Sequence, residues 1–487
     1  MTKRNRNILF FFLFILFFIL TPIIILYSLG YRIDFRTKKI VQPGILFLKV
    51  WPKNVEIYLN KKLEKKTDIF FGTALIKDLT PKKYEVEIKK DNFQTWKKEL
   101  EIKKGLATEA KNILLVPQKI NFTSLGKNTE DFFLSPDGKI LITKELTNND
   151  DNSKNESNND WSLKIFELNK NIKSHLFEKK QISKEEFEIS FLKFSPDNKK
   201  ILLKTKIFLK DKNKSLSNDA KKDSSYAYYI IDIEKTPFSI NRLNIKNYNI
   251  EDIYFNPQNY QEIFFLNENK LYKIDILKNL SLELLLDDII SFSVDNDNVY
   301  YLDKNGFIFK TNGSLSFKDK LNTSNLLIKN ETNYKIIALN SHIFVKENNL
   351  LYKINETGEL EKIFEPINNL KFSYDLKKAV FFNNYEAWVI FLQDIFEQPF
   401  RKANEKIFIA RFSENIDDIF WLTNHYLIFN FKNAIKIAEI DNRDKINIFD
   451  TNIPNNFEIS KTIWNSYNKT LLILLSKELY QSEKLTP

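Results

Sequence analysis

The feature that most constrains this chain is an uncharged, apolar stretch from Ile8 to Gly30. It reads ILFFFLFILFFILTPIIILYSLG, and its only obvious helix breakers are Thr21 and Pro22. As a helix rising about 1.5 Å per residue it spans roughly 33 Å, enough to cross a hydrocarbon core of about 30 Å. A surface helix this apolar would be insoluble, so the sequence predicts a transmembrane helix over residues 8–30.

The stretch is longer than the apolar core of a cleaved signal peptide, about 7–15 residues, so we expect it to be retained. Cleavage stays open as an alternative, because the small residues Ser28 and Gly30 fit a cleavage site. The flanking charges slightly favour a cytoplasmic body, since fewer basic residues precede the helix than follow it. Those before it are Lys3, Arg4 and Arg6, and those after it are Arg32, Arg36, Lys38 and Lys39.

No catalytic or metal-binding signature follows the apolar stretch. The chain has no Cys, so it forms no disulfide and offers neither a thiolate nucleophile nor a Cys-ligated metal site. It contains no His-Glu-x-x-His, P-loop, Gly-x-Gly-x-x-Gly or Gly-x-Ser-x-Gly motif. Its three histidines, His175, His342 and His425, fall in different predicted sheets. We therefore expect no enzyme, no catalytic residue, no metal, no cofactor and no nucleotide.

The basic residues are spread along the chain and do not form a single run. The formal net charge of +11 suits anionic lipid headgroups or acidic wall polymers. Clusters such as Lys61-Lys62 and Lys65-Lys66 are short and interleaved with Glu. We interpret them mainly as a solvated, Lys-rich surface, and we expect no nucleic-acid partner.

A short polar connector, residues 31–43, leads to a small β domain over residues 44–117. Apolar and polar residues alternate in Val55–Asn60, Tyr84–Lys89 and Glu99–Lys103, which indicates strands with one buried face. Turn signals such as Thr80-Pro81-Lys82-Lys83 separate these strands. The domain is predicted to be antiparallel, with a core of Ile57, Leu59, Leu79, Tyr84, Val86, Ile88, Phe93, Trp96, Leu100, Ile102 and Leu115.

The spacing of these strands resembles the PEGA domain family. The residues that carry the resemblance are Gly44, Pro52, Val55-Glu-Ile-Tyr-Leu-Asn60, Gly72-Thr-Ala, Leu79-Thr-Pro81, Tyr84-x-Val-x-Ile88, Asn92-Phe93 and Trp96. The chain departs from the family where the naming turn reads Pro52-Lys53-Asn54-Val55. The resemblance implies an extracytoplasmic β-sandwich without catalysis. It therefore places residues 1–7 in the cytoplasm as a tail and the body outside the cell membrane, against the flanking charges.

A turn unit repeats along residues 118–487. It reads Phe133-Leu-Ser-Pro-Asp-Gly-Lys139 and then Phe194-Ser-Pro-Asp-Asn-Lys199, with weaker copies at Phe255, Phe372 and Trp464. Repeats of about 40–50 residues with four antiparallel strands are typical of a β-propeller, and this turn resembles the blade turn of TolB-like and WD40-like propellers. Predicted blades begin near residues 129, 186, 249, 288, 333, 366, 415 and 458. That makes eight blades, or seven if the last is only a closing strand, and we expect Lys119–Leu125 to complete the final blade.

Two polar segments, 147–160 and 210–225, interrupt the repeats, and we expect both to be disordered loops. The first is rich in Asp and Asn but lacks the spacing of a Ca²⁺-binding EF-hand. The paired carboxylates Asp287-Asp288 and Asp417-Asp418 precede strands, and we interpret them as blade-edge turns and not as acid/base groups. Arg411 ends a predicted strand, where it either points into the channel or pairs with Asp417 or Asp418.

These features together predict a non-enzymatic, single-pass cell-surface protein that is all-β after its membrane helix. The propeller is expected to bind a protein, peptide or glycan of the cell envelope, with the PEGA-like module as spacer or adaptor. Two alternatives stay open, a purely structural envelope component and a glycan-active enzyme that uses the propeller channel. The expected partners are the lipid bilayer and an envelope protein or polysaccharide, and no residue marks the ligand site.

Overall fold

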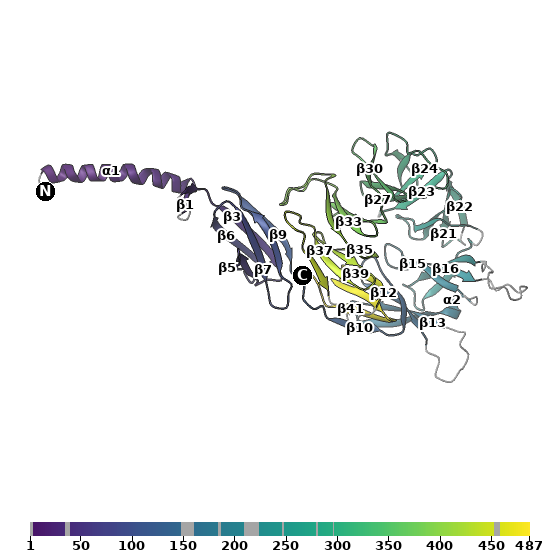
Figure 1. Ribbon diagram of the computed structural model, residues 1–487. Coiled ribbons are helices and arrows are strands. Elements are labelled where there is room, and N and C mark those ends of the chain that lie inside the picture. The colour runs from purple at the N-terminus through teal and green to yellow at the C-terminus, as the bar shows by residue number, and fades with distance from the viewer. Residues whose placement is uncertain are drawn as a thin grey trace, which may run out of the picture. The chain divides into compact units, whose positions relative to one another are not determined.

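The structure, a computed structural model of the chain, describes residues 3–34, 39–147, 160–183, 187–208, 224–245, 248–278, 281–295, 297–451 and 458–487. The chain divides into two compact units whose elements are labelled in Figure 1. Unit 1 is Met1–Phe122, Lys371–Phe457 and Ser482–Pro487, and unit 2 is Thr123–Leu370 and Glu458–Gln481. The segments expected to be loops at 147–160 and 210–225 lie almost wholly outside the described residues.

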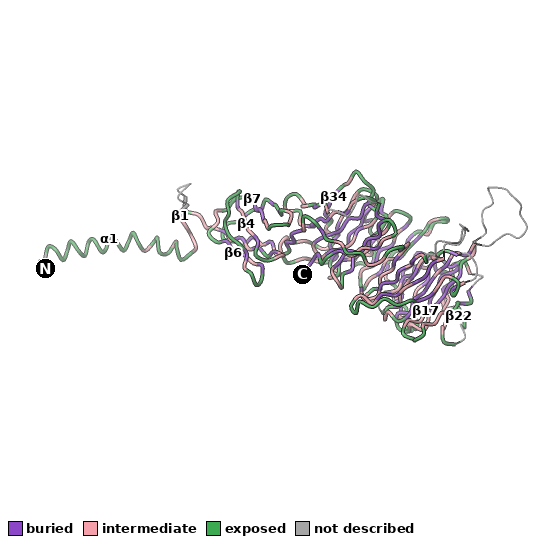
Figure 2. Tube along the Cα trace, turned by 90° about the horizontal axis from the view of Figure 1, so that it is seen from below, coloured by how far each residue is buried: buried purple, intermediate pink, exposed green. Residues whose placement is uncertain are grey.

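The apolar stretch forms the helix α1 (Lys3–Ser28), which begins earlier than predicted. Pro22 lies inside this helix and does not end it. The segment Arg4–Ser28 is long and apolar enough to cross a membrane, and none of its most apolar window is buried in the protein. Figure 2 shows this helix as exposed along its length. Membrane spans and signal sequences near the N-terminus both have this length and composition.

The connector after α1 is more regular than the sequence predicted. Strands β1 (Arg32–Asp34) and β2 (Lys39–Val41) pair antiparallel, so this segment contains a short hairpin. Residues 31–43 were predicted only to be a short polar connector, without these two strands, because alternation is hard to recognise in strands of three residues.

Residues 44–117 form two sheets. One has the strand order β6 (Thr73–Leu79), β3 (Gly44–Trp51), β9 (Ala107–Leu114), and the other the order β5 (Lys62–Lys66), β4 (Glu56–Leu59), β7 (Lys83–Lys89), β8 (Trp96–Glu101). The predicted core is buried except for Leu79 and Phe93, which are partly exposed. One prediction was wrong, because β3 and β9 pair in parallel. The chain crosses between the sheets after β8, so β9 starts beside the start of β3.

Among the described residues eight four-stranded sheets follow, and in seven of them the four strands are consecutive along the chain. Unit 2 contains β11 (Thr129–Leu134), β12 (Ile140–Leu146), β13 (Trp161–Glu167), β14 (Ile172–Glu178); β15 (Phe187–Phe194), β16 (Lys200–Phe208), β17 (Ser224–Asp232), β18 (Ser239–Arg242); β19 (Asp252–Phe255), β20 (Glu262–Asn267), β21 (Lys270–Asp275), β22 (Ser281–Leu286); β23 (Ile289–Val294), β24 (Asn298–Asp303), β25 (Ile308–Asn312), β26 (Asp319–Lys320); and β27 (Tyr334–Leu339), β28 (His342–Glu347), β29 (Leu350–Ile354), β30 (Leu360–Phe364). Unit 1 contains β31 (Asn369–Phe372, which starts at the unit boundary), β32 (Lys378–Phe382), β33 (Glu386–Phe391), β34 (Lys406–Arg411); and β35 (Asp418–Thr423), β36 (Tyr426–Asn430), β37 (Ile435–Glu439), β38 (Ile448–Thr451). A short helix, α2 (Lys179–Ile182), is an element that the sequence did not predict.

The eighth sheet joins both ends of the repeat region. It consists of β39 (Ile459–Asn465), β40 (Thr470–Leu475) and β41 (Glu478–Ser482), and β10 (Phe122–Gly126) pairs with β41. The prediction that residues near Lys119–Leu125 complete the last sheet is therefore confirmed. The first strands of the eight sheets also begin within a few residues of the predicted starts.

Consecutive sheets within each unit share hydrophobic clusters. In unit 2, for example, Ile142 and Leu163 pack with Ile201 and Leu203 of the next sheet. In unit 1 the sheets β31–β34 and β35–β38 share a cluster that includes Phe429. The sheets β15–β18 and β19–β22 share such a cluster on each face, so their middle strands read as nearly continuous apolar runs.

The repeated turn is held by the same side-chain bond in three sheets. Ser135, Ser195 and Ser373 each donate a hydroxyl hydrogen bond of 2.5–2.6 Å to the Asp two residues later, and that Asp accepts a backbone N–H in turn. Ser and Asp favour turns through such bonds. The weaker copy at Phe372 lacks the Pro but keeps the Ser and the Asp, which suffices to form the turn.

Candidate functional site

The predicted chemistry-bearing residues do not converge. His175 lies on β14, His342 starts β28 and His425 lies in the turn before β36, so each belongs to a different sheet. No group of three or more His, Asp or Glu side chains within the described ranges is arranged to hold a metal ion. The part of the chain that the structure describes therefore offers neither a catalytic triad built on these histidines nor a metal centre.

The paired carboxylates serve as partners for lysines. Asp287 and Asp288 lie in an exposed turn and contact Lys270 and Lys304 at 3.6 and 2.6 Å. The interpretation of this pair as a solvated turn agrees with the exposure of both side chains.

Arg411 was expected to point into the channel or to pair with Asp417 or Asp418. It instead lies 3.5 Å from Glu386 across β33 and β34. Its side chain is 73% exposed, so this contact holds little of the fold together.

Lysines on first strands bridge consecutive sheets. In unit 1 Lys371 on β31 lies 2.6 Å from Asp418 on β35 and 4.0 Å from the centre of the Phe420 ring. In unit 2 Lys461 on β39 lies 2.7 Å from Asp131 on β11 and 4.3 Å from the Phe133 ring. In both cases an Asp-x-aromatic sequence begins in the first half of the acceptor strand, at the start of β35 and at the third residue of β11.

A third lysine has the same neighbours without the direct ion pair. Lys193 on β15 donates to the carbonyl of Ile253 at 3.2 Å and lies 4.4 Å from the ring of Tyr254 on β19. Burial lowers the pKa of Lys193, and the nearby carboxylate of Asp252 partly opposes this. Asp252-Ile-Tyr254 is again an Asp-x-aromatic sequence at a predicted sheet start. This signal is not evident in the sequence because each copy is only three residues long.

A cavity of about 840 Å³ in unit 2 opens where three of these first strands begin. It is lined by Asp252 of β19, Ile290 of β23 and Lys335 of β27, together with the segment 328–334 before β27. This volume lies within the range of about 300–1,000 Å³ that is typical of ligand sites. The lining mixes both signs of charge with amide and hydroxyl groups, so it suits a polar ligand.

Two carboxyl groups at this cavity have shifted pKa values. Burial raises the pKa of Asp252, which Lys193 and Lys335 partly counteract. Burial also raises the pKa of Glu251, opposed by a backbone hydrogen bond at Glu268. Neither residue was singled out from the sequence, where an isolated Glu-Asp pair carries no signal.

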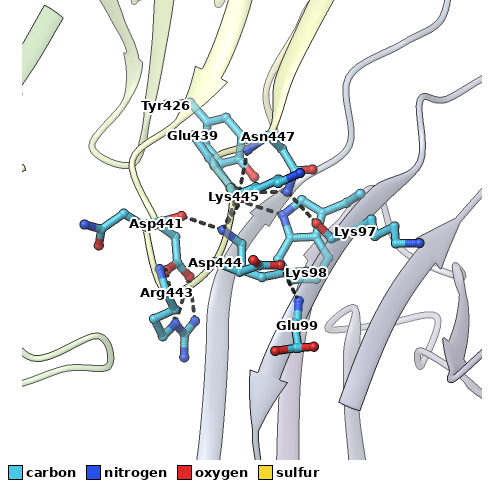
Figure 3. A network of polar contacts seen from close by, with 12 residues as sticks. Lys97, Lys98, Glu99, Tyr426, Glu439, Asp441, Arg443, Asp444, Lys445 and Asn447 are labelled. Atoms are coloured by element: carbon cyan, nitrogen blue, oxygen red, sulfur yellow. Dashed lines mark hydrogen bonds and ion pairs between the residues drawn. The ribbon is translucent and has the colours of Figure 1, made fainter. Parts of the chain in front are cut away.

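Unit 1 contains a second polar site, between residues 44–117 and the sheet β35–β38 (Figure 3). Lys98 on β8 lies 2.7 Å from Glu439 on β37, and the two side chains are 0% and 4% exposed. Glu439 also accepts the indole N–H of Trp96 at 2.8 Å. Lys98 further donates to the carbonyls of Asp441 and Lys445, at 2.5 and 3.2 Å. This buried lysine on an otherwise alternating strand was not predicted.

The same contact covers an open sheet edge. Gln398 accepts the backbone N–H of Glu109 and donates to the carbonyl of Ala107, both at 2.9 Å, so its amide replaces a neighbouring strand along β9. Arg443 donates to the carbonyl of Glu109 at 2.7 Å while bonding Asp441. An uncovered edge is a site for unwanted strand pairing. These bonds tie residues 44–117 to the loops that carry Gln398 and Arg443. The sequence predicted separate domains and gave no sign of this contact.

A small cavity of about 70 Å³ lies beside this network, lined among others by Trp96, Arg401, His425 and Arg443. It has room for a few water molecules but is far below the size of a typical ligand site. The described part of unit 1 therefore uses its buried charges to join two substructures.

No family model matches the chain, and no curated protein matches it either. Many solved structures are similar in fold. They include the C-terminal WD40 domain of Sif2, at 12% identity and TM-score 0.48, which covers 75% of this chain and 98% of that domain. The Dos1 propeller matches at 12% identity and TM-score 0.46, and the match covers 75% of this chain and 95% of the Dos1 chain. The computationally designed Ika8 protein matches at 9% identity and TM-score 0.45 over 74% and 97%.

Proposed function

We propose that this chain is a membrane-anchored binding protein of the cell envelope. Its eight four-stranded sheets are the blades of one β-propeller, and the first strands of the blades surround its channel. Residues 44–117, which resemble a PEGA module, are a rigid spacer between the anchor and the propeller. The body lies outside the cytoplasm, and the function is non-enzymatic.

The observation that carries this proposal is the cavity of about 840 Å³ at the starts of β19, β23 and β27. Asp252 and Lys335 give it both signs of charge, which suits a protein or glycan ligand with polar and charged groups. The buried Lys98–Glu439 pair supports the role of a rigid spacer, because it ties β8 to β37. The exposed helix α1 supports the anchor.

Crosslinking in intact cells tests the proposal. A photo-crosslinking amino acid at Thr332 or Asn333, which line the cavity, should capture a discrete partner. The same group at Leu282, an exposed position on β22 of the same unit, is the matched control. A discrete protein band from the cavity positions alone supports a protein ligand, and a polymer smear from those positions supports a glycan. Equal products from cavity and control positions would leave only a structural envelope role and contradict the binding function.

A second candidate function is a glycan-active enzyme. It is favoured by one observation, the raised pKa values of Asp252 and Glu251 at one cavity, because general acids in glycan hydrolysis need raised pKa values. Incubation of the purified protein with envelope polysaccharide, with new reducing ends as the readout, tests it. Product formation that Asp252→Asn abolishes would establish the enzyme, and no product would eliminate it.

A further inference from the structure

One end of the module formed by residues 44–117 is defined by the start of β3. Gly44 lies opposite Leu79, and Ile45 lies beside Ala107. The turns that join β6 to β7 and β8 to β9 are therefore at this end, which we call the proximal end. The β4–β5 turn belongs to it as well, because Asn60 donates its N–H to the carbonyl of Glu85 near the start of β7.

The proximal end is also where α1 joins the module. The Gln42 amide donates to the carbonyl of Leu29 at 3.2 Å. Arg32, just after the helix, lies 3.8 Å from Asp78 in the last part of β6. Lys104, in the β8–β9 turn, lies 5.6 Å from the centre of the Tyr31 ring. If α1 crosses a bilayer, the proximal end is the part of the module next to the lipid headgroups.

Exposed lysines gather at this end. Each of its three turns contributes lysines that are exposed to solvent, namely Lys61 and Lys62, Lys82, and Lys103 and Lys104. The nearby carboxylates Glu99 and Asp78 have cations of their own, Lys83 at 2.9 Å and Arg32 at 3.8 Å. Glu101, which lines a groove with Lys83 and Lys103, offsets part of the remaining charge. The five turn lysines still leave an excess of positive charge at this end.

Two large apolar side chains stand beside these lysines. Leu106 is 59% exposed and Phe400 is 66% exposed. Both line a groove of about 410 Å³ whose other walls include Lys83 and Lys103. The loop that carries Phe400 is fixed to β9 by Gln398, so this ring is held at the proximal end. Exposed apolar side chains among lysines are the pattern of surfaces that lie at a membrane interface.

We propose that the proximal end rests on the bilayer that α1 crosses and binds anionic lipid headgroups through these lysines, with Leu106 and Phe400 entering the interfacial layer. This inference rests on the membrane anchor of the proposed function. The lysines supply electrostatic attraction to anionic headgroups, and the two apolar side chains gain by leaving water. The same chain exposes Phe71 at 73% on the opposite end of the module, where Thr73 lies opposite Lys49, and that position gains no such contact.

The absence of Cys from the chain makes a labelling experiment direct. Full-length variants Leu106→Cys, Phe400→Cys and Phe71→Cys, each with one polarity-sensitive fluorophore, are placed in nanodiscs. The discs contain phosphatidylcholine alone, or phosphatidylcholine with an equal part of phosphatidylglycerol. In the anionic discs we expect blue-shifted emission and several-fold lower quenching by acrylamide at positions 106 and 400. We expect no change at position 71.

Charge reversal separates lipid recognition from apolar contact. The triple variant Lys82→Glu, Lys103→Glu, Lys104→Glu should lose the protection at position 106 in anionic discs. Reversal of three exposed lysines of unit 2, Lys199, Lys235 and Lys278, should leave it intact. The inference would be overturned if the labels at 106 and 400 were as accessible to water as the label at 71. It would also be overturned if the protection were equal in both kinds of disc. Either result would leave the anchor in place. A chain that does not enter nanodiscs at all would overturn the anchor and this inference together.

Discussion

Lys98 on β8 and Glu439 on β37 form an ion pair at 2.7 Å that is almost completely shielded from water, with 0% and 4% of the two side chains exposed. The two residues are far apart in the sequence, and the pair joins the module of residues 44–117 to the sheet β35–β38. Two charges can share such a site only because other groups also bond them. Asn447 donates its backbone N–H and its side-chain amide to Glu439, at 3.0 and 2.7 Å.

Breaking this pair should destabilise unit 1. Glu439→Gln leaves the Lys98 ammonium buried without its counter-charge, and we expect a loss of about 3–5 kcal/mol in the free energy of unfolding. Urea unfolding of the full chain, followed by tryptophan fluorescence, measures it. Glu109→Gln is the control, because that carboxylate pairs with Lys111 at the surface and should cost at most about 1 kcal/mol. Equal costs for the two variants would show that the buried pair contributes no more than a surface pair.

The Lys98–Glu439 pair can also be replaced as a whole. The double variant Lys98→Met, Glu439→Leu removes both charges, so neither is left without a partner. We expect it to recover most of the stability that Glu439→Gln loses, because apolar pairs of similar volume often replace buried ion pairs without loss. A double variant as unstable as the single one would mean that the bonds to the Asp441 and Lys445 carbonyls matter more than the charges.

Trp96 should contribute through both its ring and its N–H. Its side chain is fully buried and its indole donates to Glu439 at 2.8 Å. We expect Trp96→Phe to cost about 1–3 kcal/mol, because it removes a donor from a buried carboxylate. Trp96→Ala should cost about 3–5 kcal/mol. Trp464→Phe is the matched control, since the buried Trp464 indole has no hydrogen-bond partner among the described residues. A cost for Trp96→Phe no larger than that of the control would contradict the role of the bond.

His425 should make unit 1 less stable in acid. Burial lowers its pKa from 6.5 to about 4, and Lys378 adds to the shift while Asp375 and Asp441 oppose it. The unfolded chain therefore takes up this proton at a higher pH than the folded chain. This destabilisation is absent above about pH 6.5. As the pH drops from 6.5 towards 4, the free energy of unfolding falls by at most about 3 kcal/mol.

Unfolding free energies measured across this pH range test the His425 prediction. His425→Gln should remove this part of the pH dependence, so the difference between the variant and the parent chain should change between pH 6.5 and pH 4. His175→Gln is the control, because His175 lies exposed on β14 in unit 2 and its replacement leaves His425 in place. A pH profile that His425→Gln leaves unchanged would show that this residue titrates normally in the folded protein.

The Asp-x-aromatic sequences should hold neighbouring sheets together. Burial lowers the pKa of Lys371, and Asp418 opposes the shift, so removal of that carboxylate leaves a poorly solvated ammonium. We expect Asp418→Asn to cost about 1–3 kcal/mol. Asp288→Asn removes a carboxylate that is 65% exposed and should cost less than about 1 kcal/mol. Thermal unfolding of both variants measures this difference in stability, and equal melting temperatures would contradict the prediction.

The helix α1 should keep the chain in membranes. We expect the full-length protein to stay in the membrane fraction after high-salt and carbonate washing, with residues 1–30 retained. Deletion of residues 1–30 should release a soluble, folded body, because the body buries none of the most apolar part of the helix. Isolation of a natural soluble form that starts near Tyr31 would show that the helix is a cleaved signal.

The body should be accessible from outside the cell. Leu327 is 73% exposed in unit 2, and a Leu327→Cys variant introduces the chain's only thiol. We expect a membrane-impermeant maleimide to label it in intact, wall-stripped cells. Labelling only after the membrane is broken would place the body in the cytoplasm and reverse the partners proposed for it.

The sequence alone determined what depends on local patterns. The apolar run Ile8–Gly30 required a helix. Period-two alternation located β4, β7 and β8, three of the seven strands of residues 44–117, and most of the core of that module. The Ser-x-Asp turns helped to locate three of the later sheets, because a turn of this kind needs only the residues that form it. These features follow from side chains near one another in the chain, so no tertiary information was needed.

Tertiary structure alone decided what depends on partners distant in the chain. Lys98 shares the face of β8 that buries Trp96 and Leu100, where alternation leads one to expect an apolar side chain. Its charge is accommodated there only because Glu439 and the carbonyls of Asp441 and Lys445 come to it from a part of the chain more than three hundred residues later. The parallel pairing of β3 with β9 and the cavity at Asp252 and Lys335 arise in the same way. A charge can be buried only where a counter-charge and hydrogen-bond partners compensate its lost hydration, and a local pattern contains no record of which distant residues supply them.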